Sequence, residues 1–261
     1  MTPDYKNWLP RGLIYTVFAS GSILAGGGAL LGKLSPSRSC RRIAAPIVGF
    51  TGGLLLLVGG WLTYMYRVFS FDSGRQLARK IVDGVAEMVT LPEGGVGLDV
   101  GCGSGALTIA CAKNNPQGEF IGIDRWGLEY ASFSKNLCEQ NAIAEGVSNV
   151  RFQKGNAVHL DFDDETFDAV TSNLVYHNIP CRDRQKLLWE TLRVLKKGGC
   201  FALHDIFSRG NYGDMDAFLQ KLRDNGYSDV KLIDTTDGMF LTRTEALTMC
   251  MSGSALLVGR K

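Results

Sequence analysis

The residues best suited to hold a small molecule lie in the run Gly97–Ala112, GLDVGCGSGALTIACA. This pattern is typical of a buried strand, a glycine-rich turn and a helix that opens near Ser104. Gly101, Gly103 and Gly105 can adopt positive φ and let a ligand approach the backbone. The helix offers free amide N–H groups at its start. The run therefore predicts a ligand-binding turn.

Asp99 narrows the identity of that ligand. Gly101, Gly103 and Ala106 also satisfy the dinucleotide pattern G-x-G-x-x-G/A, so a nicotinamide-dependent oxidoreductase is one alternative. A carboxylate two residues before the first glycine, however, would repel a pyrophosphate and attract an ammonium group. The nucleoside that carries an amino acid ammonium in place of a pyrophosphate is S-adenosylmethionine, and we expect it to bind here.

Two residues after the next expected strand also suit a nucleoside. Asp124 ends that strand about 20 residues past the turn, where a carboxylate can accept hydrogen bonds from both ribose hydroxyls. Trp126 follows, and its ring either lies flat on adenine or is an ordinary packing residue. Both positions agree with a bound nucleoside.

Candidate catalytic residues follow the fourth and fifth expected strands. His177 has a side chain that titrates near neutral pH and can remove a proton from a hydroxyl or an acidic carbon; the alternative is a hydrogen bond that stabilises its loop. Tyr176 would shape the pocket. Asp205 would orient His204 or a substrate hydroxyl, and only one of these two neighbours is expected to face the cleft, because adjacent strand residues point to opposite faces.

Alternating strand and helix patterns from Val96 onward must position these residues. Strands are expected near residues 96–100, 119–124, 149–154, 167–172, 199–206, 229–234 and 254–259. Helices are expected near residues 72–90, 104–114, 126–142, 183–195, 213–225 and 242–249. Residues 196–199, KKGG, indicate a helix end with a glycine cap. The prediction is an α/β fold with a doubly wound, mostly parallel seven-stranded sheet, which brings ligand-binding residues to the carboxyl edge of its strands.

Four blocks in order resemble the class I S-adenosylmethionine-dependent methyltransferase family: GLDVGCGSG, IGIDRW, GNAVHLDFDDETFDAVTSNLVYHNI and LKKGGCFALHDI. The resemblance covers about residues 72–261 and implies a Rossmann-like fold with S-adenosylmethionine as methyl donor. The cofactor-binding residues it implies are Asp99, Gly101, Cys102, Gly103, Asp124, Arg125, Trp126, Asn156, Ala157 and Asn173.

Two of these positions depart from the family or lack its signature. Asn156, with the backbone N–H of Ala157, matches the position that reads adenine; the family often has Asp there, and Asn keeps an acceptor oxygen. At Asn173 the Asp/Asn-Pro-Pro-aromatic signature of amino-methyltransferases is absent. This disfavours methylation of a nucleobase exocyclic nitrogen or a glutamine nitrogen.

No metal is expected. The carboxylates of residues 161–166, DFDDET, indicate a solvated loop, because nothing else supplies metal-ligand spacing. His159 has no evident role. Seven cysteines without a C-x-x-C pair indicate a reducing compartment, with neither a disulfide framework nor a zinc site.

Two long uncharged runs, residues 12–32 and 43–66, precede the catalytic domain. Each exceeds the run of about 18 apolar residues that indicates a membrane span. A signal peptide explains the first run poorly, because its apolar region would be too long and no second span would follow. We therefore predict a membrane hairpin over residues 1–67 and a methyltransferase domain over residues 68–261. The small-residue pairs Gly28/Gly32 and Gly49/Gly53 would allow close helix contact.

Charge is unevenly distributed between these two parts. Residues 1–67 carry seven basic residues against Asp4 alone, a net of +6, so the remainder sums to −4 in a chain of net +2. An acidic remainder argues against a nucleic-acid groove. Six basic residues flank the termini side of the hairpin and four lie in the loop at 33–42, which favours both termini in the cytoplasm. Arg75, Arg79 and Lys80 would rest on anionic lipid headgroups.

These observations predict an integral membrane, S-adenosylmethionine-dependent methyltransferase that acts on a small, lipophilic or lipid-like acceptor. A short connection between Tyr66 and a helix beginning at Asp72 would hold the catalytic domain against the bilayer, where such an acceptor partitions. The alternative is a non-catalytic membrane protein that keeps the fold for cofactor binding or scaffolding.

Overall fold

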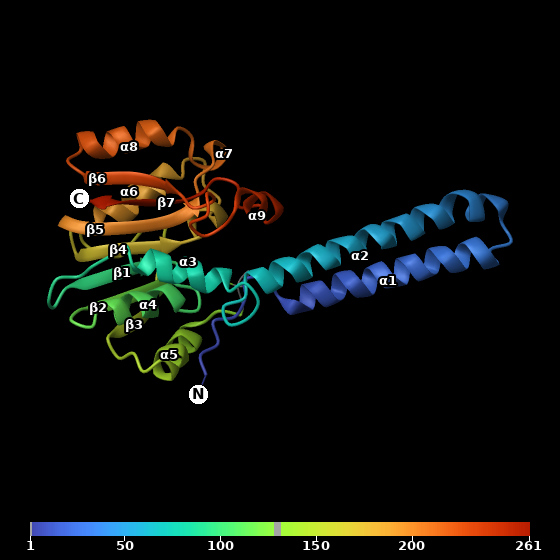
Figure 1. The fold of residues 1–261 in the computed structure, drawn as a ribbon, viewed down its shortest axis with the longest axis horizontal. Coiled ribbons are helices and arrows are strands. Elements are labelled where there is room, and N and C mark those ends of the chain that lie inside the picture. Colours follow the sequence, from blue (N-terminus) through green and yellow to red (C-terminus); the bar gives the residue numbers. More distant parts are fainter. Residues whose placement is uncertain (1, 128–131) are drawn as a thin grey trace. The chain divides into compact units, whose positions relative to one another are not determined.

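The computed structural model describes residues 2–127 and 132–261, which form two compact units (Figure 1). One unit, Asn7–Gln76, contains the helical hairpin. The other joins the segment that ends at Lys6 to Leu77–Lys261. The chain before the hairpin thus belongs to the catalytic unit, and the second boundary falls at Gln76 instead of at residue 67.

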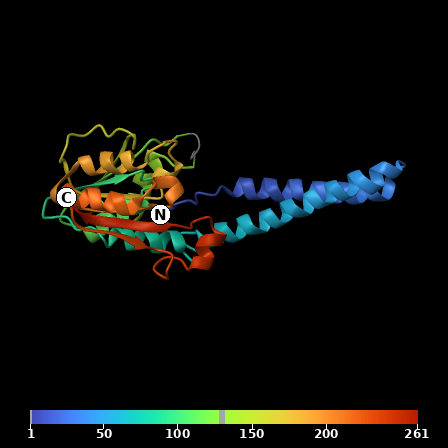
Figure 2. The ribbon, with the colours of Figure 1, turned by 90° about the horizontal axis from the view of Figure 1, so that it is seen from above.

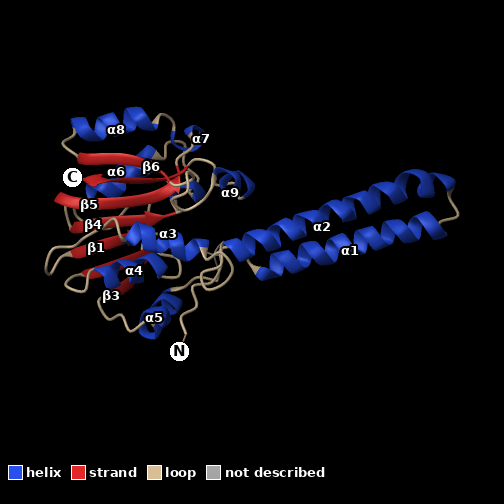
Figure 3. Ribbon diagram, in the orientation of Figure 1, coloured by secondary structure: helices blue, strands red, loops and turns tan. Residues whose placement is uncertain are grey.

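Within the described residues, a seven-stranded sheet forms the centre of the catalytic unit (Figure 3). Its strands are β1 (Val96–Val100), β2 (Glu119–Asp124), β3 (Val150–Lys154), β4 (Phe167–Asn173), β5 (Leu195–Ile206), β6 (Ser228–Asp234) and β7 (Ser254–Arg260). The order is β3-β2-β1-β4-β5-β7-β6. Strand β7 runs antiparallel to β5 and β6, and the other neighbours are parallel. The predicted α/β fold is confirmed.

Helices cover both faces of this sheet. They are α3 (Leu77–Ala86), α4 (Ala106–Asn114), α5 (Lys135–Ala144), α6 (Gln185–Arg193), α7 (Arg209–Tyr212), α8 (Met215–Asp224) and α9 (Arg243–Thr248), together with a 3₁₀ turn, η3 (Tyr176–Asn178). Helix α3 lies on one face and α6 and α8 on the other (Figure 2). Phe167, Phe201 and Phe218 are fully buried in the core that α6 and α8 cover, and burial of each contributes about 1.5–3 kcal/mol.

Three expected elements differ in the structure. Helix α3 begins at Leu77 instead of Asp72, after turns that end with Gln76 at a φ of 52°. The KKGG segment is not a helix cap: Gly198 N–H donates to the Lys261 carbonyl at 2.6 Å, so β5 extends back through this segment along the C-terminal strand. The helix expected over residues 126–142 includes residues 128–131, which lie outside the described residues, and α5 begins at Lys135.

The other unit is a hairpin of two long apolar helices, α1 (Arg11–Leu34) and α2 (Ala45–Val68), the second entered through a π-helical turn, η1 (Cys40–Ala44). Both are long and apolar enough to cross a membrane, and 17% of each apolar window is buried. Large apolar side chains of the hairpin are exposed. Phe50, for example, is 75% exposed. This surface indicates association with an apolar environment.

Glycines bring the two hairpin helices together. A Cβ on Gly28 would lie 2.4 Å from Gly49 N, and one on Gly52 would lie 2.2 Å from Ala25 N. The contact therefore uses glycines seven residues apart, because Gly21 and Gly59 also meet the opposite helix. The expected partners Gly32 and Gly53 are not in the tight contact: the nearest atom to a Cβ on Gly32 is 3.6 Å away, and nothing lies within 4 Å of one on Gly53.

Candidate functional site

The glycine-rich turn after β1 has the conformation that its sequence predicts. Gly101, Gly103 and Gly105 have φ values of 78°, 55° and 83°, which only glycine adopts without strain. The amides of Gly101 and Cys102 both donate to the Ile123 carbonyl, at 2.8 and 2.9 Å. These bonds fix the turn to the end of β2. The Cys102 side chain is buried, and burial raises the pKa of its thiol, so its contribution to the turn is its backbone.

Asp124 and Trp126 lie beside this turn and are hydrogen-bonded to it. One Asp124 oxygen accepts from Gly103 N–H at 2.9 Å and the other accepts from Trp126 N–H at 2.7 Å. The Trp126 indole N–H donates to the Gly103 carbonyl at 2.9 Å. Each carboxylate oxygen keeps a second lone pair for a ribose hydroxyl. The turn, the carboxylate and the ring thus form one connected group, with Arg125 exposed beside it.

Asp99 lies below the turn instead of on its surface. Its carboxylate is 1% exposed and accepts hydrogen bonds from Thr108 Oγ1 at 2.6 Å and Thr171 Oγ1 at 3.2 Å. Burial raises its pKa to about 7, against the lowering effect of the two hydroxyls. Direct contact with a ligand ammonium, which we expected from the sequence, does not agree with this position. The residue instead joins β1 to α4 and β4.

The expected adenine-side residues lie after β3. Asn156 is exposed, and its side-chain oxygen accepts from Val158 N–H at 3.0 Å, which shapes the turn that also holds Ala157. Asn156 follows β3, at the same edge of the sheet as the glycine turn. The two residues remain candidates for contact with adenine.

His177 and Asp205 form a close pair at the ends of β4 and β5. His177 Nδ1 lies 2.6 Å from Asp205 Oδ1, and the His177 side chain is 22% exposed whereas Asp205 is fully buried. Burial raises the pKa of the Asp205 carboxyl, but the hydrogen bond and charge of His177 and the Ile206 N–H outweigh it and hold that pKa below its usual range. An ionised carboxylate only accepts hydrogen bonds, so Nδ1 carries the proton and Nε2 is the basic nitrogen.

Tyr176 does not face the pocket, contrary to expectation. Its side chain is fully buried, and its hydroxyl lies 2.8 Å from Thr191 Oγ1 of α6. Burial raises the pKa of this phenol well above its usual value. The 3₁₀ turn explains the difference, because it directs Tyr176 into the core and leaves the next residue, His177, partly exposed.

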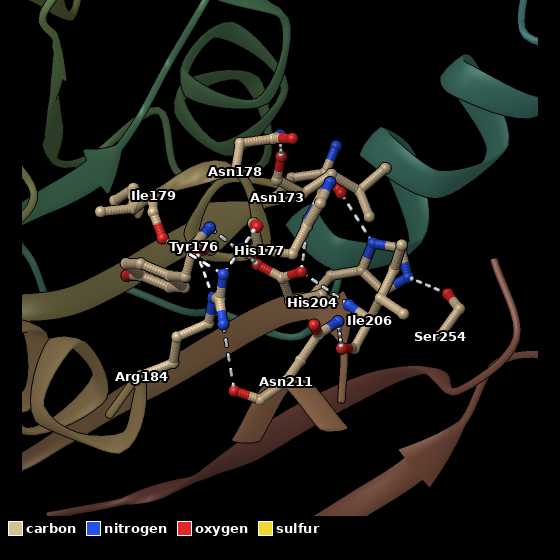
Figure 4. Close-up of polar contacts among 12 residues, drawn as sticks. Asn173, Tyr176, His177, Asn178, Ile179, Arg184, His204, Ile206, Asn211 and Ser254 are labelled. Atoms are coloured by element: carbon tan, nitrogen blue, oxygen red, sulfur yellow. Dashed lines mark hydrogen bonds and ion pairs between the residues drawn. The ribbon is translucent and has the colours of Figure 1, made fainter. Parts of the chain in front are cut away.

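Arg184 supports the backbone of the 3₁₀ turn that contains His177. No sequence motif predicted this role. Its guanidinium donates to the carbonyls of Tyr176, His177 and Ile179 at 3.1–3.3 Å (Figure 4). It also donates to the Asn211 carbonyl after β5, at 3.4 Å. Five N–H donors in a fixed plane suit such a set of carbonyls. Arg184 therefore fixes the backbone that carries His177.

His204 and Asp205 point to opposite faces of β5, as expected for neighbours on a strand. His204 is fully buried, and burial lowers its pKa to about 4, so its ring is neutral at neutral pH. Its Nδ1 lies 2.7 Å from Asn173 Oδ1. Asp205 thus pairs with His177 and not with His204.

Carboxylates of the loop at 161–166 meet basic side chains. Asp164 accepts from Arg193 at 2.7 Å, and His159, which is exposed, lies 3.7 Å from Glu190. Within residues 2–127 and 132–261, no group of three or more metal-ligating side chains occurs. The loop contacts agree with a solvated, ion-paired segment.

The candidate residues form a row along the carboxyl edge of the sheet. The strand order places Asn156 after β3, Asp124 at the end of β2, the glycine turn after β1, Asn173 at the end of β4 and the His177 pair beside β5. In the same order these groups suit adenine, ribose, a thioether-linked amino acid and a reacting acceptor. This row of residues fits an adenosyl amino acid. Asp99 is not among the residues that contact it directly, because its side chain is buried.

Residues 98–203 match the methyltransferase domain family. The demethylmenaquinone methyltransferase of Bacillus subtilis (strain 168) is 37% identical over 139 residues, which cover 52% of this chain and 54% of that protein. The same enzyme of Lactobacillus johnsonii is 30% identical over 166 residues, covering 60% of this chain and 66% of that protein. The chain spans about half the length of the first relatives it matches.

A solved structure agrees on the fold. Geranyl diphosphate C-methyltransferase from Streptomyces coelicolor A3(2), in complex with Mg²⁺, geranyl diphosphate and S-adenosyl-L-homocysteine, matches with a TM-score of 0.55 at 15% identity. The match covers 75% of this chain and 83% of that one.

Proposed function

Because the catalytic unit belongs to the class I S-adenosylmethionine-dependent methyltransferase family, we propose that the chain is a membrane-anchored methyltransferase for a lipophilic, quinol-like acceptor. The observation that carries this proposal is the His177–Asp205 pair, which lies beside the cofactor turn at the carboxyl edge of the sheet. A base at this position suits an acceptor that must lose a proton.

The cofactor lies along the row of residues at that edge in this proposal. Asp124 accepts the ribose hydroxyls, the turn at Gly101–Gly105 accommodates the chain that follows, and Asn173 lies at the amino acid end. When bound, S-adenosylmethionine supplies an electrophilic methyl group. The protein mainly positions the acceptor atom in line with that methyl group, a contribution that is largely geometric.

His177 supplies the proton transfer. Its Nε2 takes the proton from an acceptor hydroxyl, while Nδ1–H remains bonded to Asp205, whose negative charge stabilises the resulting imidazolium. The electron pair left on the acceptor oxygen delocalises onto the ring carbon that receives the methyl group. That carbon then loses its own hydrogen as a proton, and the oxygen regains a proton from the His177 imidazolium, so the ring returns to the hydroquinone state with one added methyl group and the donor is left as S-adenosylhomocysteine.

The acceptor class follows from two further observations. The relatives are named for a quinone acceptor, and two helices of this chain are long and apolar enough to cross a membrane. An acceptor that partitions into lipid would meet an anchored enzyme in one thin layer. Helix α3 carries Arg79 and Lys80, which meet anionic headgroups in this proposal, and the charge of Arg79 also acts on Asp83 and Glu145.

Kinetics of two variants test the base. His177→Gln should lower kcat by roughly 10²–10⁴-fold with unchanged affinity for S-adenosylmethionine. Asp205→Asn should also lower kcat, because it removes the carboxylate that accepts from Nδ1 and stabilises the imidazolium. A full kcat in His177→Gln would remove His177 from the chemistry.

We further propose that the catalytic unit faces the cytoplasm and that the loop near Cys40 lies on the opposite side. Cys40 is half-buried and Cys250, in the catalytic unit, is exposed, so the chain contains a matched pair of probes. In intact cells an impermeant maleimide should label Cys40 and spare Cys250, which should react only after permeabilisation. The reverse pattern would invert the topology.

A further inference from the structure

A chain of buried hydrogen bonds lies behind Asn173. His204 Nδ1 lies 2.7 Å from Asn173 Oδ1, and His204 Nε2 lies 2.9 Å from Ser254 Oγ (Figure 4). Ser254 Oγ in turn lies 2.8 Å from Thr235 Oγ1. His204, Ser254 and Thr235 are each at most 1% exposed. The chain joins β4, β5, β7 and the end of β6.

The protons of this chain can be assigned. Asn173 Oδ1 only accepts, so His204 Nδ1 must carry a hydrogen. The buried ring is neutral, so Nε2 accepts from the Ser254 hydroxyl, and Ser254 accepts from Thr235. Every described member inside the chain is satisfied, which favours one fixed arrangement.

This arrangement decides what Asn173 offers to a ligand. With Oδ1 bonded to His204, the group left at the carboxyl edge is the amide NH₂, which only donates. Asn173 is half-buried at the end of β4, next to the glycine turn at the end of β1. A donor at this place suits an anionic acceptor and opposes a cationic one.

We propose that His204 is a positioning residue that fixes the Asn173 amide with its NH₂ toward the carboxylate of the cofactor's amino acid. The inference rests on the proposed function, because it places S-adenosylmethionine along the edge of the sheet. Asp124 on one side of the glycine turn receives the ribose, so the amino acid extends past the turn toward β4 and Asn173. His204 itself touches no ligand.

Two cofactor analogues separate this role from a general structural one. S-adenosylhomocysteine carries the amino acid, and 5′-methylthioadenosine has the same adenosine and thioether without it. Isothermal titration calorimetry of the full chain in detergent measures both dissociation constants. Asn173→Asp keeps an acceptor for His204 but replaces the NH₂ by oxygen. It should weaken S-adenosylhomocysteine roughly 10–100-fold, the worth of a hydrogen bond to a charged group, and leave 5′-methylthioadenosine unchanged.

Variants of His204 complete the test. His204→Leu should show the same selective loss, and the double variant with Asn173→Asp should lose no more than either single one. His204→Gln keeps a donor for Asn173 Oδ1 and should restore most of the affinity. Equal losses for both analogues, or additive losses in the double variant, would overturn the positioning role while leaving the proposed function intact. A wild-type chain that binds neither analogue would overturn both.

Discussion

The side chain of Asn141 hydrogen-bonds both backbone groups of Asp4, 137 residues earlier in the sequence. Asn141 Oδ1 accepts from Asp4 N–H at 2.7 Å, and Asn141 Nδ2 donates to the Asp4 carbonyl at 3.1 Å. The same nitrogen donates to the Ser104 carbonyl in the cofactor turn at 3.0 Å. Tyr5 is buried next to it, and its hydroxyl donates to Glu145 at 3.1 Å. The segment before the hairpin is thus a structural part of the catalytic unit.

Asn141→Ala should therefore affect both folding and the cofactor turn. It removes three hydrogen bonds and leaves buried backbone groups unpaired, which should cost about 1–3 kcal/mol in the free energy of unfolding. Affinity for S-adenosylmethionine should fall with it. Tyr5→Phe is the matched control, because it removes one bond of the same segment without touching the turn. Denaturant unfolding measures the free energy of unfolding, and titration with S-adenosylmethionine measures the cofactor affinity. Equal cofactor affinity in the two variants would mean that the segment before the hairpin does not support the turn.

Because the His204 ring is buried, the free energy of unfolding should depend on pH. Its pKa is about 4 in the folded chain and about 6.5 when unfolded. Between these values the unfolded chain binds a proton that the folded chain does not, so stability falls as pH falls, by about 3 kcal/mol in all. The Asp99 carboxyl, with a pKa raised to about 7, acts in the opposite sense, because its folded form holds a proton and loses stability as pH rises.

Comparison with His204→Gln isolates the histidine. Denaturant unfolding of both chains at pH 7 and pH 4.5 should show the wild type losing stability relative to the variant as the pH falls. The Asp99 contribution cancels in this difference, because both chains contain it. Parallel pH curves for the two chains would mean that the ring is protonated or exposed in the folded state.

The glycine contact of the hairpin should tolerate no side chain. Gly52→Leu places a side chain where a Cβ already meets Ala25 N at 2.2 Å, whereas Gly53→Leu enters open space. The first should separate α1 from α2, because helix association in a membrane depends on close backbone packing. Disulfide cross-linking between cysteines introduced at Gly32 and Ala45, where the two Cβ atoms lie 3.6 Å apart, should fall in Gly52→Leu and persist in Gly53→Leu. Loss in both variants would remove the special role of Gly52.

The sheet could be predicted from sequence because each strand is short, apolar and followed by its own turn signal. The strand after Gly118 illustrates this, since its observed range, Glu119–Asp124, is the predicted one. The glycine turn was equally predictable, because positive φ at Gly101 is a local property. Asp124 follows from its place at the end of a strand.

Contacts between distant segments could not be predicted in this way. The position of Asp99 depends on two threonines from other elements, and Asp205 binds a histidine that we expected to act separately. Tyr176 and His177 differ in exposure only because a 3₁₀ turn rotates one into the core. The contact of Asp4 with Asn141 has no local signal at all. Long-range packing decides each of these cases.

Transfer of a methyl group to a lipophilic quinol tests the central claim most directly. The full chain is reconstituted in phospholipid vesicles that contain demethylmenaquinol and isotopically labelled S-adenosylmethionine, and the extracted lipid is analysed by mass spectrometry. We predict a quinol that gains one labelled methyl group in the wild type and only a trace in His177→Gln. Cofactor binding without any labelled lipid would contradict the assigned reaction and favour a binding or scaffolding role for the fold.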